Sequence, residues 1–264
     1  MFNLFEKTLR DKRFFILGWS CGIAFLAFAL TSFYTSFNGG QIDQLLKSVP
    51  PALEGLIGNL QDWRQLPNYL GSQIFDIRLP IFISILSILL AVSLTVGEED
   101  TGQLRTLVAM PISRAKIIAG KWLAIVVICL AASLATAIGV GVGLLQIHQS
   151  LDAMVLVRLV AFTWLLVITT ASLIFAIGMA SGKRALTTGI GIILTIGSFL
   201  LTTFSKSVDW LQNYEWLSVF HYFPATDIAR GTVVWGNVWV YAALIAISLI
   251  TAFFFFPRRD VKAS

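Results

Sequence analysis

The sequence predicts an all-α membrane protein with six transmembrane helices. Hydrophobic residues make up 57% of its 264 positions, and charged residues make up only 12%. A soluble domain carries about 25% charged residues, so most of the surface of this chain cannot face water. In addition, six long stretches contain no Asp, Glu, Lys, Arg or His. They are residues 14–37, 79–97, 122–147, 159–182, 185–205 and 231–257.

Each stretch has the length of a membrane-spanning helix. The six contain 19 to 27 residues, and about 20 apolar residues cross the hydrocarbon core. Because lipid offers the backbone no hydrogen-bond partners, each stretch must satisfy its own backbone as a helix. The shortest, 79–97, is dense in Ile and Leu. The first is longer than the core of a signal peptide and has no A-x-A cleavage site before Asn38, so we interpret it as a retained anchor.

The distribution of Lys and Arg predicts that both chain termini face the cytoplasm. If the N-terminus is inside, the inner segments 1–13, 98–121, 183–184 and 258–264 hold 13 of the 19 basic residues. Inner loops of membrane proteins are enriched in Lys and Arg, so this excess sets the orientation. The net charge of +5 is therefore a signal of topology. No basic cluster is interleaved with aromatic residues, so we expect no nucleic-acid partner.

The segments outside the spans also carry patterns: two of them predict short surface helices, and a third is rich in aromatic residues. In residues 1–13, Phe2, Phe5 and Leu9 share a helical face, which indicates a helix on the inner membrane surface; a solvated basic tail is the alternative. The outer segment 38–78 has apolar residues at helical spacing between its turn signals. The outer segment 206–230 is rich in Trp, Tyr and Phe, which fits either an aromatic belt or a segment dipping into the outer leaflet.

The predicted spans contain small residues suited to helix packing and no ionisable Asp, Glu, Lys, Arg or His. Gly18 and Gly22, like Gly139 and Gly143, lie four positions apart, which lets helix backbones approach closely. Cys21 and Cys129 are read as small packing residues. Transporters driven by ion gradients usually carry ionisable residues in their spans, and here none of the six does. Any uphill transport must therefore take its energy from another component.

Catalytic and nucleotide-binding patterns are also missing from the sequence. His148 and His221 fall in outer segments, and neither belongs to a nucleophile triad. The stretch from Gly178 to Lys183 is one residue short of a phosphate-binding loop, and Arg184 replaces the required Ser or Thr. We therefore expect that the chain is not an enzyme, holds no metal and has no nucleotide-binding domain of its own.

The inner segment 98–121, called the 98–121 loop below, is the most distinctive polar stretch. Its acidic start, Glu98 to Asp100, suits the N-terminus of a helix, where negative charge is stabilising. Leu104, Leu107 and Val108 give that helix one apolar face. Pro111 ends it, and Ser113 can cap the next helix, which runs into the third span. The pattern predicts a short helix that is acidic at its start; a simple amphipathic elbow is the alternative.

The 98–121 loop resembles the signature of ABC-2-type exporter permeases. In that family an acidic pair, a Gly and spaced leucines precede Pro-x-Ser-Arg and a Lys at the head of the third helix. Residues 9–19 resemble the family's N-terminal region, 50–54 resemble a drug and antibiotic exporter subgroup, and 256–260 resemble its cytoplasmic tail. The loop residues that match are Glu98, Glu99, Gly102, Leu104, Leu107, Pro111, Ser113, Arg114 and Lys121.

This resemblance implies a type V ABC exporter-like fold in the cytoplasmic membrane of a prokaryote. It implies two ABC ATPase subunits as partners, which hold the ATP and Mg²⁺, and a second permease subunit, which we expect to be an identical copy. The 98–121 loop is then the coupling loop: Glu98, Glu99 and Arg114 contact the ATPase, and Gly102 and Pro111 shape the loop. The substrate is expected to be hydrophobic or amphipathic: a drug, an antibiotic, a lipid-like molecule or a peptide.

Two other functional classes remain open from the sequence. One is a membrane scaffold or anchor subunit that transports nothing. The other is a secondary transporter, which the absence of charge from the six spans disfavours.

Overall fold

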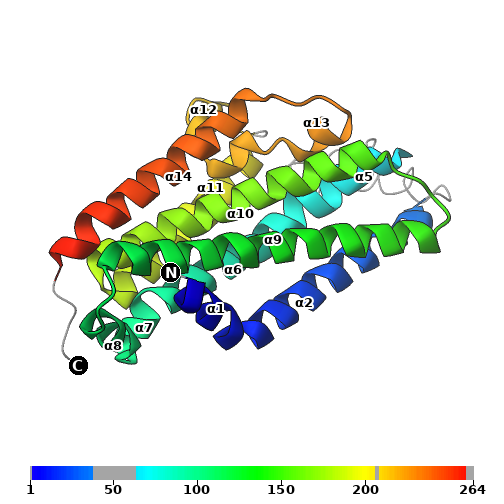
Figure 1. Ribbon diagram of the computed structural model, residues 1–264. Coiled ribbons are helices and arrows are strands. Elements are labelled where there is room, and N and C mark those ends of the chain that lie inside the picture. Colours follow the sequence, from blue (N-terminus) through cyan, green and yellow to red (C-terminus); the bar gives the residue numbers. More distant parts are fainter. Residues whose placement is uncertain (1, 38–63, 206–207, 260–264) are drawn as a thin grey trace.

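The computed structural model describes residues 2–37, 64–205 and 208–259, and in these ranges every regular element is a helix. Six helices in these described ranges are long and apolar enough to cross a membrane, which confirms the predicted fold class (Figure 1). They run Arg13–Ser36, Leu66–Asp100, Arg114–Gln146, Ala153–Ser181, Arg184–Ser205 and Gly236–Arg258.

Several spans are built from more than one helical element. The first is α2 (Arg13–Ser32) followed by the 3₁₀ helix η1 (Phe33–Phe37). The second joins α5 (Leu66–Leu70), the π-helix η4 (Gly71–Arg78), α6 (Leu79–Leu94) and α7 (Val96–Asp100). The others are α9 (Arg114–Gln146), α10 (Ala153–Ser181), α11 (Arg184–Ser205) and α14 (Gly236–Phe255) with η7 (Phe256–Arg258).

Shorter helices gather at the two ends of the bundle (Figure 1). One end carries α1 (Phe2–Asp11), α7 and α8 (Gln103–Ala109), together with both ends of the described chain; we call it the α8 end. The opposite end, called the α13 end, carries α5 and α13 (Ala225–Ala229). Before α13 the chain forms α12 (Asp209–Gln212), η5 (Glu215–Leu217) and η6 (Val219–Tyr222).

The first span packs mainly on the third, and glycines make this contact possible. A Cβ atom on Gly139 would lie 2.1 Å from the carbonyl oxygen of Ala24, so the two backbones touch there. Gly143 meets Thr31 in the same way, at 2.6 Å from its Cβ. The predicted role of this glycine pair is confirmed. The pair Gly18 and Gly22 differs, because a Cβ on either would meet nothing within 4 Å.

The fourth span, α10, packs on α6, α9, α11 and α14 and forms the centre of the bundle. Hydroxyl groups join it to its neighbours. The Ser87 and Thr170 hydroxyl oxygens lie 2.9 Å apart, and the Trp122 indole donates to the Ser172 hydroxyl at 3.0 Å. Such bonds between helices are typical of membrane bundles, where apolar packing alone specifies little.

The second span begins earlier than the predicted boundary at residue 79. The helix starts at Leu66, so residues 66–78 of the predicted outer segment 38–78 belong to the same continuous helix as the second span. The prediction stopped at Arg78 because that side chain is charged. In the structure Arg78 donates to the carbonyl oxygen of Gln73, which is itself 2% exposed. A charge covered by protein is tolerated where a lipid-facing one is not.

The sixth span begins later than predicted. Residues 231–235 precede α14, which starts at Gly236. Gly231 has a φ of +90°, a conformation that suits glycine and interrupts a helix, so the chain turns here after α13. The other four predicted spans differ from the observed helices mainly at their ends. Helices α9 and α10 begin before Lys121 and Arg158, the charged residues at which the predicted spans were cut.

The outer and N-terminal segments match the predictions in part. Residues 208–230 form the short helices α12, η5, η6 and α13, and Trp210, Trp216, Trp235 and Trp239 nearby are exposed. The helices predicted within 38–63, with the stretch 50–54, lie outside the described residues. Helix α1 forms as predicted, but Leu4 and Thr8 are its buried residues, because α1 packs on α9 beside Gly120.

The glycine contact between α2 and α9 gives a stability prediction. We expect Gly139→Ala to destabilise the protein by about 1–3 kcal/mol, because its methyl group would collide with the Ala24 carbonyl. Gly141→Ala, in the same helix with nothing within 4 Å of the new Cβ, should be neutral or stabilising by about 0.5–1 kcal/mol. Thermal unfolding of the detergent-solubilised variants measures the difference. Equal melting temperatures for the two would contradict the packing.

Candidate functional site

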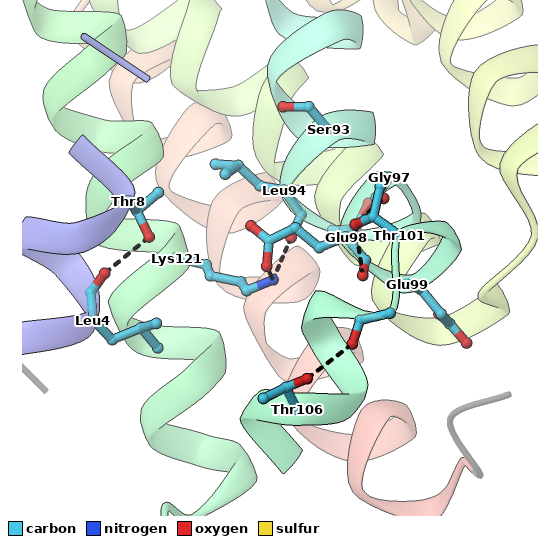
Figure 2. A network of polar contacts seen from close by, with 12 residues as sticks. Leu4, Thr8, Ser93, Leu94, Gly97, Glu98, Glu99, Thr101, Thr106 and Lys121 are labelled. Carbon is cyan, nitrogen blue, oxygen red and sulfur yellow. Dashed lines mark hydrogen bonds and ion pairs between the residues drawn. The ribbon is translucent and has the colours of Figure 1, made fainter. Parts of the chain in front are cut away.

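The 98–121 loop forms an ordered unit of two short helices at the α8 end (Figure 2). The chain bends at Thr95, whose φ and ψ are −113° and −95°, and α7 follows. Helix α10 approaches this bend so closely that a Cβ on Gly178 would lie 2.3 Å from the Thr95 hydroxyl oxygen. The start of the loop is therefore fixed against the centre of the bundle.

Gly102 divides the loop into two helices where the sequence predicted one. Its φ of +75° breaks the helical path, so Glu98 and Glu99 lie in α7 and the leucines in α8. Glycine takes this conformation at little cost, whereas other residues resist it. The predicted end of the helix is confirmed, since α8 stops at Ala109, just before Pro111. Ser113 caps α9 by accepting from the Lys116 amide at 3.4 Å.

Lys121 is completely buried and holds α7 to α9. Its ammonium donates to Glu98 Oε2 at 2.6 Å and to the carbonyl oxygen of Leu94 at 2.7 Å (Figure 2). The Lys121 side chain is 0% exposed and that of Glu98 is 16% exposed. Removing one partner of such a pair leaves a charge without compensation, which is strongly destabilising. This ion pair therefore fixes the position of the loop relative to the third span.

The other two charges of the predicted site also have partners within the chain. Glu99 is 6% exposed, and its Oε2 accepts from Arg259 Nη2 at 2.6 Å. Arg114 Nη1 lies 3.0 Å from each of the carbonyl oxygens of Phe256 and Pro257 and 2.8 Å from that of Arg259. Asp100 and Arg184 are 3.4 Å apart and both largely exposed, so their pair contributes little.

Helix α8 has one face against the protein and one face open. Leu104 and Leu107 are buried, at 1% and 6% exposure, as the apolar spacing predicted. The opposite face lines a shallow hollow in the surface. The residues of this open face are Thr101, Gly102, Gln103, Arg105, Thr106 and Ala109.

The structure brings most of the predicted site residues together and adds one. Glu98, Glu99, Leu104, Leu107, Arg114 and Lys121 all make contacts that hold the loop in place. Sequence reasoning missed Arg259, the partner of Glu99. The sequence did single out residues 256–260, which resemble the family's cytoplasmic tail, but that resemblance does not say which residue Arg259 contacts. The arrangement is that of an ordered loop whose buried charges are paired within the chain.

Six apolar helices in the described residues, with an ordered two-helix segment between the second and third, define a multi-pass membrane protein. The chain belongs to the ABC-2 transporter family, since the family model described as "ABC-2 family transporter protein" matches residues 3–261. No curated protein sequence matches the chain. A permease of this family is a transmembrane component of an ABC transporter, is not itself an ATPase and works with an ABC ATPase in the membrane.

The buried ion pair gives a second stability prediction. We expect Lys121→Met to destabilise the protein by about 3 kcal/mol, because Glu98 keeps its charge and loses its partner while only 16% exposed. Lys116→Met, which changes an exposed lysine five residues earlier, should have little effect. Combining Lys121→Met with Glu98→Gln should recover part of the loss, because no unpaired charge remains. Melting temperatures that fail to separate Lys121→Met from Lys116→Met would refute the role of the pair.

Proposed function

We propose that this chain is the permease subunit of an ATP-driven exporter. The observation that carries the proposal is the construction of the 98–121 loop. Its buried charges are paired within the chain, its leucines are buried, and the outer face of α8 stays open at the end of the bundle. A rigid element with one free polar face suits a loop that must follow a moving partner.

The open face of α8 is the proposed docking surface for the ATPase. Gln103, Arg105 and Thr106 present polar groups there. In this proposal Glu98, Glu99, Arg114 and Lys121 position the loop, and the ATPase contact itself falls to α8. Gly102, Pro111 and Ser113 set the direction of α8, and Leu104 and Leu107 anchor it. The ATPase is present in two copies and holds the ATP and Mg²⁺, and this chain binds no cofactor.

The transport path is proposed to lie between two identical copies of the permease. Helices α6 and α11 pack on each other, and each presents an exposed apolar stripe. A groove of about 570 Å³ adjoins α6 along α2 and is lined almost entirely by apolar groups, among them Phe82. Such surfaces favour a hydrophobic or amphipathic substrate, such as a drug, an antibiotic, a lipid-like molecule or a peptide. The stripe residues are Ile81, Phe82, Ile85 and Leu89 of α6 and Leu186, Ile190, Ile193, Ile196, Leu200 and Phe204 of α11.

The α8 end is proposed to face the cytoplasm of a prokaryotic cell. The basic residues of the inner segments support this orientation, since 13 of the 19 lie there. Helix α9 is long enough to hold the loop outside the membrane. Its 33 residues span about 50 Å, longer than the roughly 30 Å hydrocarbon core, so its first turns can extend beyond the membrane with the loop.

The docking surface gives a functional prediction for the reconstituted complex of permease and ATPase. We expect Arg105→Glu to weaken ATPase binding about tenfold and to lower export, because it reverses a charge on the open face of α8. Gln149→Glu, which places a negative charge at an exposed site on the α13 end, should preserve both. Co-purification of the ATPase and ATP-dependent export are the measurements. If the unmodified complex binds an ATPase yet exports nothing, the chain is an anchor subunit and the proposal fails.

The proposed orientation gives a topology prediction. In a Cys21→Ser background, a cysteine replacing the exposed Gln149 should react with a membrane-impermeant thiol reagent in intact cells. A cysteine replacing Gln103 should react only after the membrane is opened. Cys129 is buried and serves as the internal unreactive thiol. Labelling of the Gln103 position from outside would reverse the orientation.

A further inference from the structure

The end of the sixth span folds under the 98–121 loop. After α14 the chain forms η7, where Phe256 is completely buried, and Arg259 then adopts an extended backbone. The Arg259 guanidinium reaches Glu99 at 2.6 Å, with side-chain exposures of 15% and 4%. This contact joins residues 160 positions apart. Because the pair is largely removed from water, it is screened less than a surface ion pair.

A second arginine holds the same residues from the other side. Arg114, at the start of α9, bonds the carbonyl oxygens of Phe256, Pro257 and Arg259, and its guanidinium carbon lies 5.7 Å from the centre of the Phe256 ring. The last carbonyls of a helix lack partners within the helix. Arg114 supplies these partners, so the end of the sixth span and the start of the third are joined.

A third contact is made at the turn between α10 and α11. Gly182 has a φ of +59°, and a Cβ atom there would lie 1.1 Å from Arg259 Nη1. The guanidinium therefore occupies the space that any other residue at 182 would fill. Arg259 thus touches α7 through Glu99 and the α10–α11 turn through Gly182.

We propose that residues Phe256–Arg259, called the strap, transmit motion of the 98–121 loop to the fourth, fifth and sixth spans. Arg259 is the positioning residue of the strap. When the ATPase displaces α8 and α7, Glu99 moves Arg259, and the α10–α11 turn and α14 follow. The inference rests on the proposed function, since it assumes an ATPase acting on α8. It assigns the strap a part in coupling that requires no contact with substrate or ATP.

The first test changes the charge at the centre of the strap. In the reconstituted complex, Arg259→Gln should leave ATPase binding and ATP hydrolysis close to those of the unmodified protein. It should lower the melting temperature, because Glu99 loses its ion-pair partner Arg259 at 4% exposure, and adding Glu99→Gln should restore the melting temperature, so coupling is measured in both variants. The amount exported per ATP hydrolysed should fall at least about fivefold, the lower range of a typical coupling effect. Arg258→Gln is the matched control within the strap. The Arg258 side chain is exposed, and its guanidinium bonds the carbonyl oxygen of Phe254 and stacks on the Phe254 ring, both in α14 and away from the 98–121 loop.

The second test displaces Arg259 without altering its charge. Gly182→Ala places a methyl group where the guanidinium lies and should reduce export per ATP as Arg259→Gln does. Gly231→Ala introduces a similar backbone strain at a φ of +90° with nothing near the new Cβ, and should leave that ratio intact. In the Arg259→Gln background, Gly182→Ala should add no further loss of coupling, because two changes acting on one contact are not additive.

These measurements separate the strap from the proposed function. An unmodified complex without ATP-dependent export would overturn the proposed function. Normal export per ATP from Arg259→Gln in a working complex would overturn the strap alone. A loss of export that follows a lost ATPase subunit, or that Glu99→Gln reverses together with the melting temperature, would give Arg259 a structural role and would also overturn the strap.

Discussion

The buried ammonium of Lys121 is the constraint on which the arrangement of the α8 end depends. A lysine with no exposure to water is tolerated only with close partners, and here they are Glu98 and the Leu94 carbonyl oxygen. The same contact sets the distance between the second and third spans where they leave the bundle. With α7 held in this way, Glu99 points to the sixth span and α8 keeps its leucines inward. One ion pair thus orders a whole polar segment.

Much of the fold follows from the sequence because lipid allows few alternatives. Uncharged stretches of about 20 residues must be helices in a bilayer, which is why six spans could be predicted. The same rule began the second span at residue 79, whereas the helix that contains it begins at Leu66, and within it Arg78 donates to the carbonyl oxygen of Gln73. It also missed that α7 and α8 are separate, because a glycine can either continue a helix or take the positive φ that ends it, and the charge and leucine spacing around Gly102 does not distinguish the two.

The sequence identified most residues of the candidate site and the local ends of its helices, but not the partners of its charged side chains. The spacing of Leu104 and Leu107 gave the buried face of α8, Pro111 gave its end and Ser113 gave the start of α9, since these are local properties. The partners of Glu99 and Arg114 lie more than 140 residues away, so no local pattern identifies them. As a result the charges looked free for an external partner in the sequence, whereas the structure pairs them within the chain.

The contact between the first and third spans bears on how the protein is made. Ala24 and Gly139 touch across 115 positions of chain, and the second span is synthesised between them. At about 5–20 residues per second, the first helix waits roughly 6–23 s before its partner has been translated. During that interval its close-packing surface faces lipid or the insertion machinery. Assembly of this bundle is therefore a late event in biosynthesis, completed only after the third helix has entered the membrane.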